Sequence, residues 1–128
     1  MKVMGGLFYV REEEGDGWQV MAACAFPQKV GQIVKGGSLR TAEVLKKPFL
    51  LAPPPSGTLY PYSALLKPRA AGILYLPFYS EATGEVVAIV ELLLAEKPEE
   101  EIVQRLEGLL PRIGTYWWSR QGRFVGVA

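Results

Sequence analysis

Five aromatic residues have the types and the spacing of a small-molecule binding pocket. Tyr60 and Tyr62 lie in a proline-rich stretch, and Tyr75, Phe78 and Tyr79 lie in the apolar run that follows it. In a strand, Tyr75 and Tyr79 share one face and Phe78 lies on the other. Aromatic walls with a few hydroxyl groups suit a small organic ligand. Core packing, with the hydroxyls bonded to solvent or backbone, explains the same residues more simply, so the pocket is a hypothesis.

A second aromatic group, Tyr116, Trp117 and Trp118, lies at the end of an amphipathic segment. Successive residues of an α-helix point about 100° apart around its axis, so the two tryptophans do not both face one core. One of them is predicted to be exposed, where it could anchor a second copy of the chain or another protein. The alternative is that the edge of a sheet covers it.

The chain has few of the residue types that catalysis or metal binding would require. The chain has no histidine and one cysteine, so it lacks the commonest general base and metal ligand. Cys24 has neither a histidine to activate its thiol nor a second thiol, and we expect it to be a small buried hydrophobe. Glu12, Glu13 and Glu14 are adjacent, and neighbouring strand residues point apart, which favours solvated side chains. We predict no catalytic residue, no metal and no cofactor.

Length and composition indicate one folded domain over residues 1–128. Apolar residues make up 49% of the chain and charged residues 21%, which excludes a disordered segment or a coiled coil. A formal net charge of +1 gives no electrostatic basis for binding nucleic acid or an acidic membrane surface. The opening "MKVMGGLFYV" lacks the apolar core of a signal peptide, and the uncharged run 70–80 is too short to cross a bilayer. A cytoplasmic protein is the expectation.

Hydrophobic periodicity and turn residues predict a mixed order of strands and helices. The predicted strands cover residues 5–12, 18–26, 29–35, 49–52, 71–79 and 85–95. A short helix is predicted from Ser38, which can cap it by accepting from the amide of Thr41, to the lysines before Pro48. A long helix is predicted in 97–122, with a kink at Pro111. Its apolar stripe is predicted to face the core and contains Ile102, Leu106, Leu109, Leu110, Ile113 and Trp117.

The hairpin "GILYLPFYSEATGEVVAIVELLL", residues 72–94, is apolar on both faces of both strands, and Glu91 alone interrupts the apolar face of Val87, Ile89 and Leu93. Strands of this kind lie in the middle of a sheet that is covered on both sides. Pro77 has no N–H to donate, so we expect it beside a bulge or a gap in strand pairing.

Read in order, these segments resemble a GAF domain, a sensory and regulatory module of bacterial signalling proteins and phosphodiesterases. "GGSLRTAEVLKKPFLLAPP" is similar to the family's glycine-led short helix, which ends in a Lys-Pro pair and a buried strand. "AGILYLPFYSEATGEVVAIVELLL" is similar to its central hairpin, and "PEEEIVQRLEGLLPRIGTYWW" to its closing helix. With the first hairpin, the resemblance covers roughly residues 5–121.

The resemblance implies an α+β fold of the GAF type, related to PAS and profilin-like folds. Its central antiparallel sheet would carry helices on one face and a cover of loop and short helix on the other, with any ligand beneath that cover. The implied function is non-catalytic regulation in bacterial signal transduction. The partners would be an unidentified small molecule and a second copy or an attached effector protein, without nucleic acid or membrane. The alternative is a ligand-free scaffold or dimerisation module of roadblock or profilin-like type.

Overall fold

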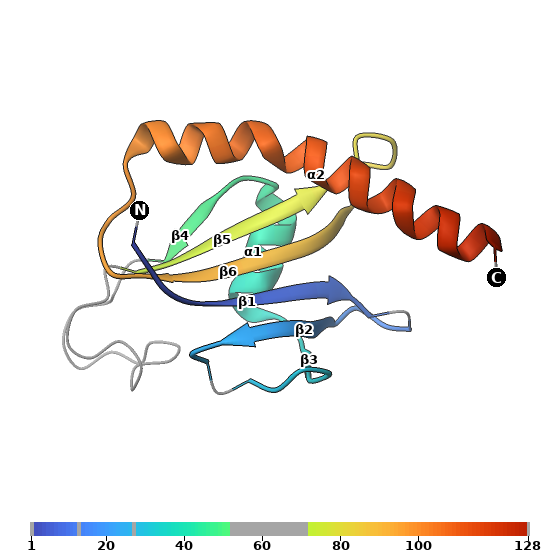
Figure 1. Cartoon of the computed structure of the whole chain (residues 1–128), viewed down its shortest axis with the longest axis horizontal. Helices are drawn as coiled ribbons and strands as arrows, with labels where there is room; N and C mark the ends of the chain where they lie inside the picture. The colour runs from blue at the N-terminus through green and yellow to red at the C-terminus, as the bar shows by residue number, and fades with distance from the viewer. Residues whose placement is uncertain (1, 13, 27, 52–71, 128) are drawn as a thin grey trace.

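Within the part of the chain that the structure describes, six strands form one antiparallel sheet (Figure 1). The structure is a computed structural model that describes residues 2–12, 14–26, 28–51 and 72–127. For residues 121–127 it describes the helical backbone and not the side chains. The strand order is β3-β2-β1-β6-β5-β4. The strands are β1 (Val3–Arg11), β2 (Trp18–Cys24), β3 (Ile33–Val34), β4 (Phe49–Leu51), β5 (Gly72–Tyr79) and β6 (Val86–Leu94). Along the chain the strands follow one another as predicted, with β3 much shorter than expected.

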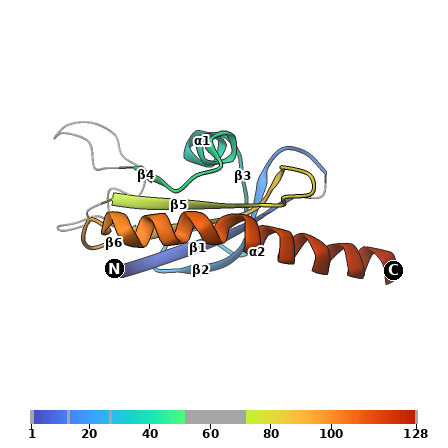
Figure 2. The ribbon, with the colours of Figure 1, turned by 90° about the horizontal axis from the view of Figure 1, so that it is seen from above.

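The two helices cover opposite faces of the sheet (Figure 2). The short helix α1 (Gly37–Leu45) buries Leu39 and Ala42 in a core that contains Ile73 of β5. The long helix α2 (Glu100–Val127) buries Leu110 in a second core that contains Leu74. Because successive residues of β5 point to opposite faces, one strand contributes to both cores. We call these two sides of the sheet the α1 face and the α2 face.

The β5–β6 hairpin lies at the centre of the sheet, as its apolar character predicts. Both strands are buried on both faces for most of their length. Pro77 pairs with Ile89 of β6 and lies beyond Tyr75, where the pairing of β5 with β4 ends. The β5–β6 register shifts directly after Phe78. Pro77 therefore lies where the missing N–H interrupts no β4–β5 ladder bond, as expected.

The apolar stripe of α2 is divided between the sheet and the solvent. Leu110, Gly114 and Trp117 lie toward the sheet, whereas Leu109 and Ile113 are 41% and 45% exposed. The prediction that Leu109 and Ile113 belong to the core is therefore wrong. A periodic pattern defines an apolar sector of a helix, but the sector here is wider than the sheet can cover. Pro111 lies inside the helix, which changes direction along its length in Figure 1.

The backbone of α2 touches the end of β5. A Cβ atom placed on Gly114 would overlap the carbonyl carbon and oxygen of Tyr79. The next residue, Thr115, accepts a hydrogen bond at Oγ1 from the amide of Glu81, at 3.0 Å. Glycine thus permits the close approach, and the threonine fastens the β5–β6 turn to the middle of the helix.

Cys24 ends β2 at a part of the sheet that α2 does not cover. Its side chain is exposed, so the expectation of a buried small hydrophobe is wrong. The physical reason lies in the placement of α2, which packs on β5 and β6 and leaves the end of β2 open. A shallow hollow of about 220 Å³ lies here, lined in part by Phe8, Cys24 and Val90.

Candidate functional site

A buried carboxylate lies in the middle of the α1 face. Glu91 of β6 stands opposite Leu7 of β1 on one side and Tyr75 of β5 on the other. Its side chain is 1% exposed, and Tyr9 and Tyr75 beside it are also buried. An ionised carboxylate is rarely buried unless it is paired or hydrogen-bonded. This position in an apolar sheet therefore needs a specific explanation.

Two tyrosine hydroxyls meet the two oxygens of this carboxylate. Tyr9 donates to Oε1 of Glu91 at 2.7 Å, and Tyr75 donates to Oε2 at 3.3 Å. Hydrogen bonds from a hydroxyl to an ionised acceptor are among the stronger ones in proteins. The ring of Phe49 stacks on that of Tyr75, with ring centres 5.8 Å apart, and so supports its position. We call Tyr9, Tyr75 and Glu91 the carboxylate cluster.

The carboxylate cluster lines a cavity of about 140 Å³ between the sheet and the first turn of α1. The sheet contributes the three cluster residues. The rest of the wall is formed by the end of β3, the link to α1 and the first turn of α1, and it consists of Val34, Lys35, Gly36, Gly37, Ser38 and Leu39. The cavity thus lies between a buried carboxyl group and the start of a helix, which is an arrangement suited to a small polar ligand.

Two glycines shape the helical wall of this cavity. The N-cap of α1 is Gly36, and no side chain caps the helix, so the predicted cap by Ser38 is wrong. Gly36 and Gly37 have φ angles of 71° and 59°, in the left-handed region that glycine enters without strain. The chain therefore turns into the helix before Ser38, and Ser38 becomes a wall residue of the cavity.

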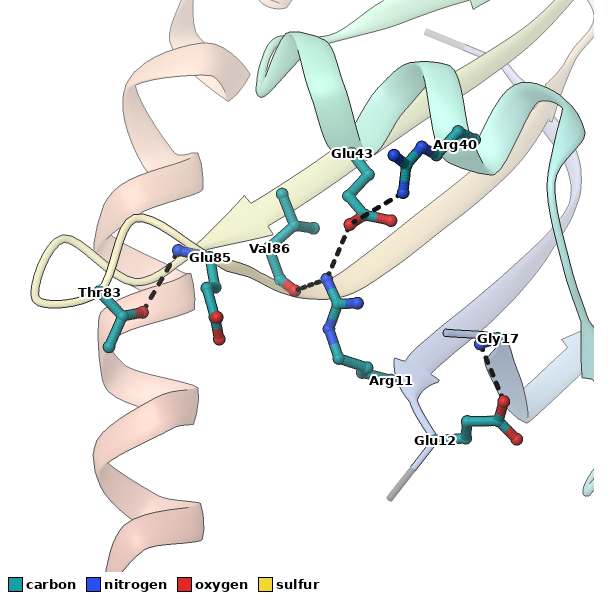
Figure 3. A network of polar contacts seen from close by, with 8 residues as sticks. All are labelled: Arg11, Glu12, Gly17, Arg40, Glu43, Thr83, Glu85 and Val86. Carbon is teal, nitrogen blue, oxygen red and sulfur yellow. Dashed lines mark hydrogen bonds and ion pairs between the residues drawn. The ribbon is translucent and has the colours of Figure 1, made fainter. Parts of the chain in front are cut away.

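A second hollow, of about 300 Å³, lies at the other end of α1 and is lined by charged groups and backbone. Arg11, at the end of β1, donates to Oε2 of Glu43 at 3.1 Å and to the carbonyl oxygen of Val86 at 3.0 Å (Figure 3). The guanidinium also lies 4.7 Å from the centre of the Trp18 ring. Arg40 reaches the same Glu43 oxygen at 4.0 Å. Arg11 therefore connects α1 to strands β1 and β6.

Arg11→Ala is expected to lower the free energy of unfolding by about 1–2 kcal/mol. The side chain is 32% exposed and loses a charged pair, a backbone acceptor and a cation–π contact at once. Arg40→Ala is the matched control, because Arg40 is 66% exposed and meets Glu43 only at the limit of an ion pair. Its change should stay within about 0.5 kcal/mol. Urea denaturation of the two variants tests this, and equal losses would contradict it.

Three of the five aromatic residues proposed from the sequence lie in the part of the chain that the structure describes. Tyr60 and Tyr62 lie outside the described residues. Tyr75 is buried on the α1 face within the carboxylate cluster. Tyr79 is partly buried and packs against both cores, whereas Phe78 packs in the α2-face core. Of the described residues in that set, Tyr75 alone lines the cavity, and ligand binding by the set stays a prediction.

The aromatic residues near the end of α2 point in different directions. Trp117 meets the ring of Phe8 edge to face, with ring centres 5.7 Å apart. Trp118 is 40% exposed and lines a small hollow that also includes Arg11. Tyr116 is 58% exposed, and its hydroxyl accepts from Nε of Arg120 at 2.9 Å. Trp117 thus belongs to the packed side of the helix, and the other two rings are accessible.

Sequence reasoning did not select Glu91 and Tyr9 as site residues. The available signal was the lone carboxylate among the apolar residues of β6, since a charge at a buried strand position is uncommon. Nothing in the sequence pairs it with Tyr9, which lies 82 residues away. Among the described residues, no Asp, Glu and Cys side chains gather in a group of three or more that could hold a metal ion.

No helix in the described part of the chain is long and apolar enough to span a membrane. No protein-family model matches the sequence. No curated protein matches it either.

Solved structures with the same architecture belong to signalling proteins. The GAF domain of a two-component sensor histidine kinase from Bacillus halodurans superposes with a TM-score of 0.65 at 13% identity, covering 95% of this chain and 87% of that one. A methyl-accepting chemotaxis protein fragment, residues 122 to 287, gives a TM-score of 0.60 at 12% identity over 92% of this chain and 77% of that one. The fold is therefore the α+β GAF fold, as the sequence resemblance implied.

A third similar structure is that of the NreA protein from Staphylococcus aureus, mutated in its nitrate binding site. It superposes with a TM-score of 0.54 at 12% identity, covering 85% of this chain and 87% of that one. At these identities the likeness concerns the fold.

Proposed function

We propose that this chain is a non-catalytic sensory domain of bacterial signal transduction that binds a small molecule in the cavity beneath α1. The observation that carries the proposal is the carboxylate cluster, in which a buried carboxyl group and two buried hydroxyls line one cavity. A convergent set of polar groups in an otherwise apolar site is typical of ligand recognition. The GAF fold supports this proposal, since the similar structures come from a sensor kinase, a chemotaxis protein and a protein with a nitrate binding site.

Strand β5 offers a route from the cavity to α2. It carries Tyr75 in the cavity wall and ends at Tyr79, whose backbone touches Gly114 of α2. If β5 can adopt two placements and the ligand binds one of them more tightly, the ligand would shift the populations of the corresponding α2 placements. The helix would pass that shift to a second copy or to an attached effector, in a protein that we place in the cytoplasm.

The experiment is a thermal-shift screen of nucleotides, amino acids and oxo-acids against the full chain and two phenylalanine variants. Ser38→Phe fills the cavity wall, whereas Val44→Phe places the same ring on an exposed position of α1, 66% exposed and outside the cavity. A ligand of the cavity raises the melting temperature of wild type and of Val44→Phe by mass action, and not that of Ser38→Phe. An equal shift in all three proteins would place the ligand elsewhere, and no shift with any compound would count against the sensory function.

A second candidate function is self-association without a ligand. The exposed residues Leu109, Ile113 and Tyr116 are spaced by four and three positions, so they form one row along α2. A row of large apolar side chains on a helix is a typical contact surface for a second helix. This observation favours the scaffold alternative, or a sensor that signals as a dimer.

Ile113→Ser is expected to weaken dimerisation by at least about tenfold if the α2 row is the contact surface. Light scattering over a concentration series should then show dimers of wild type and monomers of the variant. Val44→Ser is the control, because Val44 is exposed on α1 and outside this row. A wild type that stays monomeric over the whole series would refute self-association through α2.

A further inference from the structure

We infer that the hollow at the C-terminal end of α1 binds a zwitterion, a small molecule with one ammonium and one carboxylate group, such as a free α-amino acid. We call this site the charged hollow. Its lining consists of Arg11, Glu43, Lys46, Gly84, Glu85 and Val86. The cavity beneath the first turn of α1 shares none of these described lining residues. The inference therefore concerns a second site and goes beyond the function proposed above.

The ionisable side chains of the charged hollow balance one another. Two of them, Arg11 and Lys46, are positive, and two, Glu43 and Glu85, are negative. Because these charges cancel, the lining favours neither a simple anion nor a simple cation. A zwitterion finds a partner of opposite charge for each of its two groups, through hydrogen bonds of the stronger, charge-assisted kind. The volume of about 300 Å³ equals roughly ten water molecules at about 30 Å³ each, which is enough for an amino acid.

Arg11 is fixed in place and still has hydrogen-bond donors to offer. Its Nη2 atom donates to Glu43 and to the carbonyl oxygen of Val86, and the guanidinium lies against the ring of Trp18 (Figure 3). These two bonds use the two N–H groups of Nη2 out of the five that a guanidinium carries. Within the part of the chain that the structure describes, Nε and Nη1 have no acceptor. They are available to the carboxylate of a ligand.

Lys46 reaches the charged hollow from an unusual backbone position. It is the C-cap of α1 and has a φ angle of 54°, in the left-handed region where glycine is the usual residue. Its Nζ atom lies 3.5 Å from the place that a Cβ atom on Gly84 would occupy, so the side chain extends from α1 to the β5–β6 turn. No described carboxylate lies within ion-pair distance of Nζ. Backbone strain of this kind often marks a functional position.

Glu43 and Glu85 supply acceptors for the ammonium group of the ligand. Glu43 meets Arg11 and Arg40 through Oε2, so its Oε1 atom remains available. Glu85 is exposed, and its backbone amide donates to Oγ1 of Thr83 while its carboxylate lines the hollow. Donors and acceptors thus occur together in one space, as recognition of both ends of a zwitterion requires.

The test compares zwitterions with singly charged analogues on the full chain. Glycine, alanine and leucine carry both groups, ethylammonium chloride and sodium acetate carry one each, and acetamide carries neither. Because the lining is partly exposed to solvent, a Kd of roughly 1 mM is expected for the zwitterions. At about 20 mM and constant ionic strength they should raise the melting temperature by roughly 6 °C. Each analogue should bind at least about tenfold more weakly in calorimetry.

Two variants assign the binding to the charged hollow. Lys46→Gly removes the ammonium group and the backbone strain together, so the free protein should melt about 2–4 °C higher while its Kd for glycine weakens at least about tenfold. A gain in stability with a loss of binding cannot come from a damaged fold. Glu85→Gln should weaken binding by a similar factor. The controls are Lys47→Met and Glu81→Gln, which remove exposed charges just outside the hollow and should leave the Kd unchanged.

The outcomes also separate this site from the cavity beneath α1. Saturable binding of the zwitterions that Lys46→Gly and Glu85→Gln weaken, and that Ser38→Phe leaves intact, supports the inference. Binding that Ser38→Phe abolishes and Lys46→Gly does not change overturns it and assigns the ligand to the cavity beneath α1. Equal binding of ethylammonium or acetate overturns the zwitterion class. The absence of any binding up to 50 mM, on the order of fifty times the expected Kd, overturns the inference as a whole.

Discussion

Alanine at position 114 is expected to lower the free energy of unfolding by at least about 2 kcal/mol, because the added methyl group overlaps the backbone of Tyr79. A flexible side chain could move aside, whereas the backbone of Tyr79 is held by its pairing with Val86 of β6. Alanine is a better helix former than glycine by about 1 kcal/mol, so the collision must exceed that gain. Urea denaturation of wild type and Gly114→Ala gives the difference directly.

Gly108 provides a control on the same helix. A Cβ atom at Gly108 would meet nothing within 4 Å, so Gly108→Ala should raise stability by about 0.5–1 kcal/mol through helix propensity alone. The same substitution six residues apart is thus expected to change stability in opposite directions. A stabilising effect at both positions would show that α2 does not depend on the close contact with β5.

The contact at Gly114 also bears on the signalling proposal. If β5 transmits a change from Tyr75 to α2, loosening this contact should uncouple the helix from the sheet. Hydrogen exchange of the α2 amides would then be faster in Gly114→Ala than in Gly108→Ala under native conditions. A ligand that slows this exchange in wild type should lose the effect in Gly114→Ala.

The centre of the fold was predictable because its physical cause is local. Two strands that are apolar on both faces must lie inside a sheet with cover on both sides, and the hairpin of residues 72–94 does so. Its proline also follows the rule for residues without an N–H, since Pro77 lies past the β4 pairing. A strand-length run that is apolar at nearly every position, instead of at every second one, indicates this central placement directly.

The orientation of α2 was not predictable from the same kind of pattern. Leu109 and Leu110 are equal in a hydrophobicity scale, yet Leu110 is buried and Leu109 is exposed. What decides between them is the close approach at Gly114, and a glycine adds nothing to an apolar stripe. A one-dimensional periodicity therefore defines the apolar sector and leaves open which part of it meets the sheet.

Of the three residues in the carboxylate cluster, the sequence analysis proposed only Tyr75 as a site residue. The aromatic pattern included Tyr75, and Glu91 was visible as an interruption of an apolar strand. Tyr9 joins them because β1 pairs with β6, which connects the first strand of the chain to the sixth. Such a pairing depends on strand order across the whole sheet, and local patterns do not determine it.

Substitutions in the carboxylate cluster are expected to lower the free energy of unfolding. Glu91→Leu should cost about 3 kcal/mol, because it removes the charged acceptor of two buried hydroxyls. Tyr9→Phe alone should cost about 1.5–3 kcal/mol, the usual contribution of a hydrogen bond to a charged group. In the Glu91→Leu background the Tyr9 hydroxyl has lost this acceptor, so Tyr9→Phe should then cost clearly less than it does in the wild type.

The double-mutant cycle of Tyr9 and Glu91 should accordingly show a coupling energy of at least about 1.5 kcal/mol, measured by urea denaturation of the four proteins. The control is Tyr116→Phe, because the hydrogen bond of the Tyr116 hydroxyl with Arg120 is exposed to solvent. This substitution should change the free energy of unfolding by no more than about 0.5 kcal/mol in either background. Additive effects of Tyr9→Phe and Glu91→Leu would contradict the hydrogen-bonded cluster. A strong coupling would show that the sheet holds the carboxylate in place before any ligand arrives, which is what a rigid recognition site requires.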